Sequence, residues 1–406
     1  MKVLQVNSVA NIGSTGRIME QIGLAAQRAG WESYIAYGRR ASISQSHLIK
    51  IGSSLDIMWH GVVSRLFDAH GLGSHLATRR FIKTIQDIKP DIIHLHNVHG
   101  YYLNYKVLFE YLAQTDIPVV WTLHDCWPLT GHCAYFDFAH CELWKTECSN
   151  CVNKLDYPST IGADRSTFNH QLKIKLFNSV QNLTFVPVSQ WLANLVSQSY
   201  FHNHKIQVIN NGIDLSQFRL FEPQEMGQLR NALGLKDETI LLGVASVWSP
   251  RKGLDDFIAL SRRIPANWKI ILVGLTQKQL SLLPSNIIGI QRTENVRQLA
   301  MLYSMSSIFV NPTYEDTYPT TNLEAIACGT PVVTYRTGGS PESITDEVGR
   351  VVDKGDLDGV IKAVENILII NRDLLRNTCR KYAEENFNMQ DKFQEYIHLY
   401  NKILNK

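Results

Sequence analysis

The chain has 406 residues, of which 45% are hydrophobic, and a formal net charge of +3. This length leaves room for two domains of ordinary size, each with its own core. The nearly balanced charge gives no support for nucleic acid as a partner, and no apolar run reaches the roughly twenty residues that a membrane-spanning helix needs.

The beginning of the chain, Met1–Asn7, has too short an apolar run for a signal peptide, and we interpret it as a first strand. We therefore expect a cytoplasmic location as the default. Seven cysteines in a reducing compartment argue against a disulfide framework.

In the first half of the chain, short apolar runs alternate with segments of helical periodicity. A loop rich in Gly, Ser and Asn, 7–15, precedes a helix expected at 16–29. Its glycines, Gly13 among them, could approach a phosphate or another ligand through backbone N–H groups, or could form an ordinary turn. Further strands are predicted at 34–37, 92–95, 119–123 and 183–188, and further helices at 76–88 and 107–114. This alternation predicts a parallel sheet covered on both faces.

One helical segment carries its apolar side chains on a single face, formed by Trp59, Val62, Val63, Leu66 and Phe67. Three basic residues follow it, Arg79, Arg80 and Lys83. Such a face could dock on an anionic membrane surface. Packing against the core is the interpretation that we favour.

Histidines gather after two of the predicted strands. His94, His96 and His99 surround the end of the strand at 92–95, and His124 follows the strand at 119–123. The first group lacks a paired carboxylate at a useful spacing for a metal, so we interpret it as substrate-binding or structural and prefer the structural role. On local sequence alone, a single histidine such as His124 is also more often structural than catalytic.

Four of the seven cysteines lie within nineteen residues of a long insertion that is rich in aromatic residues: Cys133, Cys141, Cys148 and Cys151. Cys148-x2-Cys151 has the spacing of a zinc knuckle, and four thiolates would complete a structural zinc site. Free thiols or a redox pair are the alternatives.

A turn signal, Asn210-Asn211-Gly212, separates this pattern from a second alternation. Its strands are predicted at 240–245, 269–273, 308–311 and 332–335, and its helices at 254–263, 296–305 and 321–327. We place the domain boundary between residues 204 and 205. Two doubly wound domains that face each other across a cleft would hold a ligand at the carboxyl ends of their strands.

Two adjacent cations, Arg251 and Lys252, precede Gly253 on the loop after the strand at 240–245. A guanidinium and an ammonium on a strand-to-helix loop can together neutralise a diphosphate. A solvated surface pair is the alternative, but the position at the carboxyl end of a strand favours binding.

The stretch 315–324 carries the most information about function. Thr321 can cap a helix at whose start the N–H groups of Thr320–Asn322 offer a seat for a phosphate. Glu324, after Leu323, could hold the hydroxyls of a ribose or a hexose, a combination that suits a nucleoside diphosphate sugar. The alternative is a capping box, in which Glu324 only satisfies backbone N–H groups.

Asp316-x7-Glu324, followed by Ala325-x-Ala327-x-Gly329-Thr330-Pro331-Val332, resembles the paired-acid motif of the retaining glycosyltransferases of family 4, which have the GT-B fold. The usual first acid of that motif is Glu. Here Asp316 is aligned and Glu315 directly precedes it, so either could take the role. Lys252-Gly253 is in register with the Arg…Lys-Gly loop of the family. The resemblance covers nearly the whole chain and is most specific between residues 240 and 344.

The resemblance implies transfer of a sugar from a nucleoside diphosphate sugar to a hydroxyl of a saccharide or lipid-linked saccharide, with retention and without a metal or other cofactor in catalysis. The acceptor would belong to a bacterial surface polysaccharide, such as capsule or lipopolysaccharide, and would bind domain 1–204, to which a final helix at about 388–406 returns. Domain 205–387 would bind the donor. The implied donor-binding residues are Gly13, Arg251, Lys252, Glu315, Thr320, Thr321, Asn322, Leu323 and Glu324, with His124 and Asp316 as catalytic residues beside the sugar.

Two other functions fit the same fold. A nucleotide-sugar epimerase or hydrolase would need acid–base residues around the sugar and no acceptor site, and a non-catalytic subunit would only bind nucleotide sugar. A lipid-linked acceptor would bring the protein into peripheral contact with the inner face of the membrane. Asp356-x-Asp358 resembles the metal-binding pair of transferases with another fold, but Asp356 is more simply explained as a helix N-cap.

Overall fold

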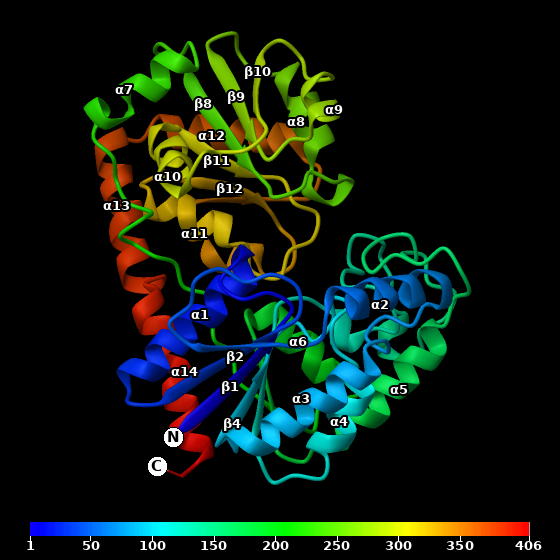
Figure 1. Ribbon diagram of the computed structural model, residues 1–406. Coiled ribbons are helices and arrows are strands. Elements are labelled where there is room, and N and C mark those ends of the chain that lie inside the picture. The colour runs from blue at the N-terminus through cyan, green and yellow to red at the C-terminus, as the bar shows by residue number, and fades with distance from the viewer. Residues whose placement is uncertain (406) are drawn as a thin grey trace. The chain divides into compact units, whose positions relative to one another are not determined.

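The computed structural model describes residues 1–405, which form two compact units (Figure 1). Unit 1 consists of Met1–Asn210 together with the C-terminal segment from Gln390, and unit 2 consists of Asn211–Met389. The predicted boundary at residue 204 is therefore six residues too early. Strand β7 (Lys205–Ile206) pairs with β6 (Leu183–Pro187), which keeps it in the sheet of unit 1.

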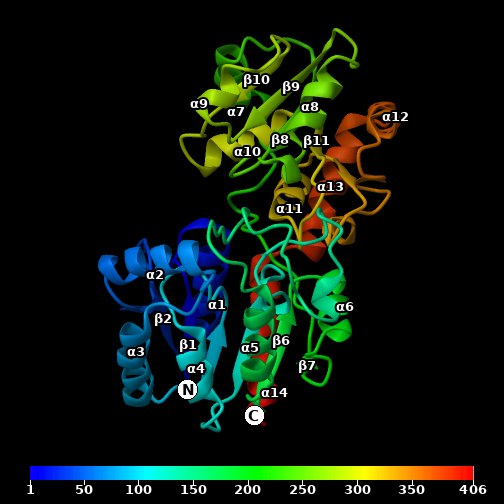
Figure 2. The same cartoon turned by 90° about the vertical axis from the view of Figure 1, so that its right-hand side faces the viewer.

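The strands of unit 1 form one parallel sheet in the order β3-β2-β1-β4-β5-β6-β7. Besides β6 and β7, its strands are β1 (Lys2–Asn7), β2 (Glu32–Tyr37), β3 (His47–Lys50), β4 (Ile92–Leu95) and β5 (Val119–Leu123). Its helices are α1 (Gly13–Arg28), α2 (Ser54–Phe67), α3 (His75–Ile88), α4 (Tyr105–Leu112), α5 (Ser166–Asn178), α6 (Gln190–Gln198) and α14 (Met389–Ile403). The central strands β4, β5 and β6 are buried along their whole length, as expected of a sheet covered on both faces. Figure 2 shows α6 beside β6 and β7.

The strands of unit 2 also form one parallel sheet, in the order β10-β9-β8-β11-β12-β13. They are β8 (Thr239–Val244), β9 (Trp268–Val273), β10 (Ile287–Ile290), β11 (Ile308–Asn311), β12 (Val332–Tyr335) and β13 (Gly349–Val352). The helices are α7 (Pro223–Ala232), α8 (Leu254–Ser261), α9 (Gln277–Leu280), α10 (Val296–Met305), α11 (Thr320–Ala327), α12 (Leu357–Leu368) and α13 (Arg372–Asn386).

The strand order reverses once in each sheet, between β1 and β4 in unit 1 and between β8 and β11 in unit 2. Both units are therefore doubly wound, as the sequence predicts. In such sheets ligands bind beside the carboxyl ends of the strands at the reversal point. The loops that follow β1, β4, β8 and β11 are thus the places to look for a site.

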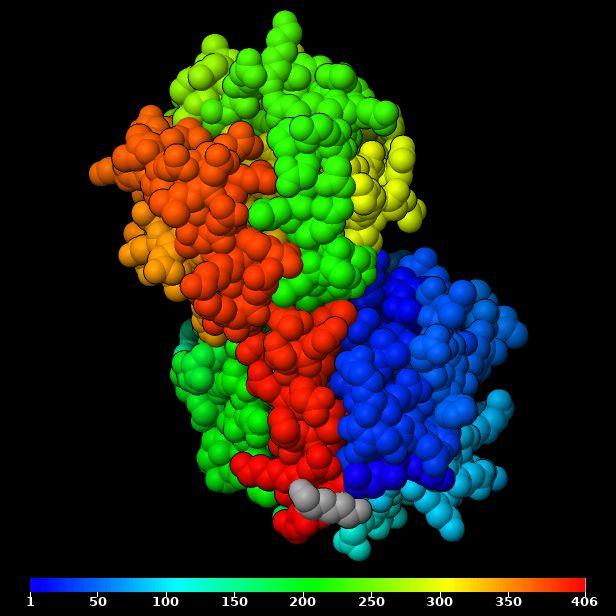
Figure 3. Space-filling model, turned by 90° about the vertical axis from the view of Figure 1, so that its left-hand side faces the viewer, coloured from blue at the N-terminus to red at the C-terminus, as the bar shows by residue number. Residues whose placement is uncertain are grey.

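The C-terminal helix α14 packs against the sheet of unit 1. The hydroxyl of Tyr400 bonds Nδ1 of His94 at 2.6 Å, and the hydroxyl of Thr122 donates to that of Tyr396 at 3.1 Å. Figure 3 shows this helix, in red, along the blue N-terminal segment, where Tyr400 packs against Trp31. His94 therefore has a structural role, which is the interpretation that the sequence favours.

The four strands that sequence periodicity does not predict are β3, β7, β10 and β13, the edge strands of the two sheets. Edge strands keep one side open to solvent, and β3 has three exposed residues of four, so they lack the continuous apolar run of a central strand. Helix α1 begins at Gly13 rather than at residue 16, so Gly13, Ser14 and Thr15 belong to its first turn and not to a loop. Among the described residues, none of the helices has the length and apolar character to cross a membrane.

Candidate functional site

Two loops meet at the reversal point of the sheet in unit 2, one after β8 and one after β11. The backbone N–H of Tyr314 donates to the carbonyl of Arg251 at 2.8 Å, and the Arg251 guanidinium donates to the carbonyl of Glu315. Gly253 has a φ of +73°, and a Cβ at this position would lie 2.3 Å from the carbonyl oxygen of Pro312. The close approach of the two loops therefore requires glycine at residue 253.

An ion pair joins the same two loops. Nζ of Lys252 lies 2.5 Å from Oδ2 of Asp316, and the two side chains are 24% and 17% exposed. Glu315, by contrast, is fully buried. Of the two acids that could be the first of the pair, Asp316 is the one whose carboxylate reaches the accessible surface beside the cations.

Helix α11 starts at the same place without a side-chain cap. Its N-cap is Pro319, which has no side chain able to accept a hydrogen bond, so the prediction that Thr321 caps the helix is wrong. Thr320 and Thr321 are the first two residues of the helix, and both are partly exposed. The first N–H groups of a helix have no partner within it, so this end can receive an anion.

Glu324 does not form a capping box. Its carboxylate accepts a hydrogen bond from the hydroxyl of Tyr303 at 3.0 Å, and Tyr303 itself is fully buried on α10. Burial, followed by the charge of Glu324, raises the pKa of Tyr303 well above its ordinary value, so the hydroxyl keeps its proton and donates. Glu324 is partly exposed. The capping interpretation is thus replaced by an acid that α10 holds at the edge of the site.

Besides Glu315, two more of the predicted donor-binding residues have buried side chains. Oδ1 of Asn322 accepts from Nδ2 of Asn311 at 2.8 Å, and Nδ2 of Asn322 donates to the hydroxyl of Ser340 at 3.1 Å. Leu323 is fully buried. These two side chains fix α11 against β11 and the 340–343 turn rather than facing a ligand. Sequence reasoning missed Tyr303, Asn311 and Ser340, because no local motif links them to 316–324.

In unit 1, His124 follows β5 and belongs to a chain of hydrogen bonds. Nε2 of His124 lies 3.1 Å from Nδ1 of His96, and Nε2 of His96 lies 3.2 Å from Oε1 of Gln5. The amide nitrogen of Gln5 donates to the carbonyl of Met19 at 2.9 Å, which leaves Oε1 of Gln5 as the acceptor. His96 therefore carries its proton on Nε2 and accepts at Nδ1 from Nε2–H of His124. Burial lowers the pKa of His124 to about 4, so this ring is neutral at neutral pH.

His99 forms a second contact beside this chain, 2.9 Å from Oδ2 of Asp125 through Nε2. His96, His99, His124 and Asp125 line one small pocket at the carboxyl ends of β4 and β5. Gly13, at the start of α1, is exposed and has a φ of +66°. The candidate residues of unit 1 thus follow β1, β4 and β5, on both sides of the reversal point of this sheet.

The four cysteines of the insertion line one small cavity of about 20 Å³ in unit 1. The thiols of Cys133 and Cys151 are hydrogen-bonded to each other, which raises the pKa of Cys133 and lowers that of Cys151 to about 7. The backbone N–H of Gly131 donates to Sγ of Cys148 at 3.2 Å. Across residues 1–405, however, no group of three or more His, Cys, Asp or Glu side chains is arranged to hold a metal ion. The zinc site stays a prediction.

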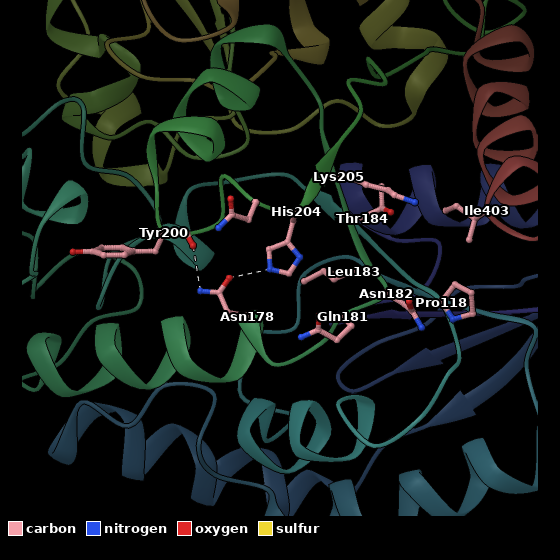
Figure 4. A pocket seen from close by; sticks show the side chains of 11 residues that line it. Pro118, Asn178, Gln181, Asn182, Leu183, Thr184, Tyr200, His204, Lys205 and Ile403 are labelled. Atoms are coloured by element: carbon pink, nitrogen blue, oxygen red, sulfur yellow. Dashed lines mark hydrogen bonds between the residues drawn. The ribbon is translucent and has the colours of Figure 1, made fainter.

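Two further features, Asp356 and a depression in unit 1, do not belong to the candidate site. Asp356 is the N-cap of α12 and accepts from the N–H of Gly359 at 2.8 Å, which confirms the structural interpretation of the Asp-x-Asp sequence. A depression of about 610 Å³ in unit 1 is lined by residues such as Pro118, Leu183 and Lys205 (Figure 4). It lies at the amino-terminal ends of β5, β6 and β7, the opposite end from the one where ligands bind in doubly wound sheets.

Solved structures with the same arrangement of sheets define the class. The chain is similar over 99% of its length to the structure of Anabaena Alr3699/HepE in complex with UDP, with a TM-score of 0.71, 15% identity and 100% of that chain covered. It is also similar to sucrose-phosphate synthase of Thermosynechococcus elongatus, with a TM-score of 0.70, 17% identity, and 100% and 99% of the two chains covered. The fold is that of the GT-B glycosyltransferases.

Family models identify the chain within this class. A model described as Glycosyltransferase Family 4 matches residues 15–217, and a model described as Glycosyl transferases group 1 matches residues 226–386. The chain belongs to glycosyltransferase family 4. It is 24% identical to WcaC of Escherichia coli (strain K12), named for colanic acid biosynthesis, over 99% of this chain and all of the relative. It is also 24% identical to the capsular polysaccharide biosynthesis glycosyltransferase CapM of Staphylococcus aureus, over 52% of this chain and 59% of that protein.

Proposed function

We propose that the chain transfers a sugar from a nucleoside diphosphate sugar to a hydroxyl of a saccharide or lipid-linked saccharide, with retention of the anomeric configuration. The observation that carries this proposal is the set of groups at the reversal point of unit 2. The loop that carries Arg251 and Lys252 contacts the loop that carries Asp316. The second loop leads into the start of α11, which has no side-chain cap, and Glu324 is a partly exposed acid of this helix. The complexes of the similar HepE protein with UDP and with UDP-glucose support this class of donor.

In this proposal the diphosphate binds Arg251, Lys252 and the first N–H groups of α11, at Thr320 and Thr321. The Arg251 guanidinium, which donates to the Glu315 carbonyl, carries five N–H donors in a planar fork that matches the geometry of a phosphate. Lys252 has three donors and shares one of them with Asp316. The two cations and the partial positive charge of the helix offset the diphosphate charge, so transfer needs no divalent metal.

We assign Glu324 to the ribose hydroxyls of the donor. Its ionised carboxylate accepts from the hydroxyl of Tyr303, and acceptance from hydroxyls is the chemistry that a ribose requires. Asn322, Leu323 and Glu315 contribute by position, because their buried side chains fix the start of α11 and the loop before it. Gly13 offers only backbone groups, at the start of α1 in unit 1.

No covalent nucleophile is proposed. The bond between the anomeric carbon and the diphosphate oxygen breaks, a bond from this carbon to the acceptor oxygen forms on the same face, and the acceptor proton passes to the departing diphosphate. Catalysis then rests on stabilising the charge of the leaving group and on positioning the acceptor. Asp316 and His124 take the catalytic roles that the family resemblance implies. Because burial keeps His124 neutral, its contribution is a hydrogen bond and not a positive charge.

The names of two relatives support a biological setting for this proposal. WcaC is named for colanic acid biosynthesis and CapM for capsular polysaccharide biosynthesis. We therefore propose a growing bacterial surface polysaccharide, or its lipid-linked precursor, as the acceptor. Its hydroxyl would be used at the cytoplasmic face of the membrane, where nucleotide sugars are present.

The test is a thermal-shift screen of the purified chain against nucleoside diphosphates and nucleotide sugars, because a ligand of the native state raises its stability. The best donor is then incubated with and without lipid-linked acceptor, and the anomeric configuration of the product is read by NMR. Acceptor-dependent transfer with retention supports the proposal. Conversion or hydrolysis of the donor without acceptor would identify an epimerase or hydrolase, and binding without any product would identify a non-catalytic subunit.

A further inference from the structure

Helix α2 packs with its polar side inward and its apolar side outward. Its buried residues are His60 and Ser64. Its exposed apolar residues are Leu55, Met58, Trp59, Val62, Leu66 and Phe67, of which Leu55 is 71% exposed, Trp59 64% and Phe67 56%. The interpretation of this helix as a core-packing element is wrong. A surface helix normally turns its apolar face to the core, so this face lacks the partner that its composition requires.

Polar contacts explain the orientation of α2. Nδ1 of His60 lies 2.9 Å from the hydroxyl of Ser74, at the start of α3, and Nε2 of His60 accepts from the N–H of Gly71 at 3.0 Å. Gly73 lies against the same ring, where a Cβ would come within 2.5 Å of Cγ of His60. These contacts hold the apolar side chains away from the core.

The exposed surface extends onto the insertion that follows β5. The N–H of Ile161 and the hydroxyl of Thr160 both donate to the carbonyl of Arg65, at 2.9 and 2.8 Å. Residues 160–162 therefore lie against the last turn of α2, and Ile161 is 73% exposed. We call the exposed side chains of α2 together with Ile161 the apolar face. Figure 1 shows α2 and the insertion next to each other at the edge of unit 1.

The two helices α2 and α3 carry exposed cations but few acids. Between residues 54 and 83 the basic side chains are Arg65, Arg79, Arg80 and Lys83, and all four are exposed. The acids of this stretch are Asp56 and Asp68. Asp56 accepts from the N–H of Ser53 at 2.8 Å and completes the capping box of α2, and Asp68 is buried beside His132. Within residues 54–83 the accessible charge is therefore mainly positive.

We propose that the apolar face docks on an anionic lipid surface, with Trp59 and Phe67 entering the interface and Arg65, Arg79, Arg80 and Lys83 contacting the lipid headgroups. Apolar side chains beside cations are the combination that binds such surfaces. A second copy of the chain fits less well, because a two-fold dimer would bring the same cations face to face. Docking is separate from sugar transfer, since it requires neither donor nor acceptor.

The test is sedimentation of the full chain with vesicles of phosphatidylcholine, alone or mixed with phosphatidylglycerol. We expect binding to the anionic vesicles that weakens as salt is raised. Replacing Trp59→Gln together with Phe67→Gln should weaken binding on the order of tenfold or more. Ile369→Gln is the matched control, because Ile369 is 85% exposed on unit 2.

Charge variants test the cationic surroundings. Arg79→Gln and Arg80→Gln should each weaken binding about fivefold, the effect of one basic residue near an anionic surface. Arg292→Gln, an exposed arginine of unit 2, should leave binding unchanged. Because every replaced residue is exposed, thermal melting of the variants should match that of the parent protein.

Fluorescence tests insertion directly, since Trp59 is the only exposed tryptophan in the described part of the chain. Anionic vesicles should shift the emission to the blue, and Trp59→Phe should keep the binding but remove the shift.

Failure to bind anionic vesicles at low salt, or equal binding by the Trp59→Gln and Phe67→Gln double variant, would overturn the proposal. A dimer that this double variant dissociates would show that a second copy covers the apolar face instead. Sugar transfer to a water-soluble acceptor is measured without vesicles, so each proposal can fail alone.

Discussion

Replacing Glu324 by Gln separates its proposed contact with ribose from its contact with Tyr303. Gln keeps a carbonyl oxygen that can accept from the Tyr303 hydroxyl, now 3.0 Å from Oε2 of Glu324. The fold should therefore lose about 1 kcal/mol or less. Glu324→Ala removes the acceptor and leaves a fully buried hydroxyl without this bond, which should cost about 1–3 kcal/mol of stability.

The effect on nucleotide binding should differ from the effect on folding. Hydrogen bonds to a charged acceptor contribute about 1.5–3 kcal/mol and neutral ones about 0.5–1.5 kcal/mol. Loss of the charge at Glu324 should therefore weaken binding by about 1–2 kcal/mol, which raises the Kd for nucleoside diphosphate about 5- to 30-fold. Tyr303→Phe is the matched control, because it removes the internal bond of Glu324 and keeps the carboxylate.

Calorimetric titration with nucleoside diphosphate measures this difference, and thermal melting of each variant verifies the fold. We expect Glu324→Gln to melt near the parent protein and to bind more weakly, and Tyr303→Phe to melt earlier and to bind nearly as well. Unchanged affinity in both Glu324→Gln and Glu324→Ala would refute the ribose contact and leave Glu324 as a structural partner of Tyr303.

Four further predictions concern the site and the rest of the chain. Asp316→Asn should lower kcat on the order of tenfold or more. Because the Glu315 side chain is fully buried, Glu315→Gln should mainly lower the Tm. A larger loss of kcat in Glu315→Gln would make Glu315 the first acid. Burial lowers the pKa of His60 from 6.5 to about 4, so between these values the unfolded chain binds a proton that the folded chain does not. The free energy of unfolding is therefore not reduced by His60 above pH 6.5, and it decreases by up to about 3 kcal/mol as pH falls to 4. The Tm should fall less steeply with decreasing pH in His60→Gln than in the parent protein, and an identical slope would contradict the assignment. Turnover should persist in EDTA without added magnesium or manganese, and activity that EDTA abolishes and magnesium restores would overturn the metal-independent mechanism. Elemental analysis of the purified protein should nonetheless find one zinc per chain. This zinc should be absent from the double variant Cys133→Ser and Cys151→Ser, and its forced removal should lower the Tm. A chain without zinc would contradict the proposed zinc site.

The sequence by itself determined the fold class and the positions of the loops that carry Arg251, Lys252 and Asp316. The central strands are continuous apolar runs because both of their faces are covered, so β5, β8 and β11 can be recognised without a structure. A group that directly follows such a strand lies at the carboxyl end of the sheet whatever the rest of the chain does. Arg251, Lys252 and Asp316 could be assigned in this way. Asp356 could be assigned as an N-cap, because Asp is a favoured residue at a helix start.

Only the tertiary structure decided how these groups pair. Lys252 and Asp316 are 64 residues apart in the chain. Glu324 accepts a hydrogen bond from Tyr303 on the neighbouring helix α10 instead of capping helix α11, to which it belongs. Helix α2 is a second example, because periodicity reveals that it has an apolar face but does not determine whether that face points to the core or to solvent. The hydrogen bonds of His60 to the turn before α3 turn it outward. Local sequence encodes the propensity and the periodicity of an element, whereas the partner of each side chain depends on segments that only packing brings together.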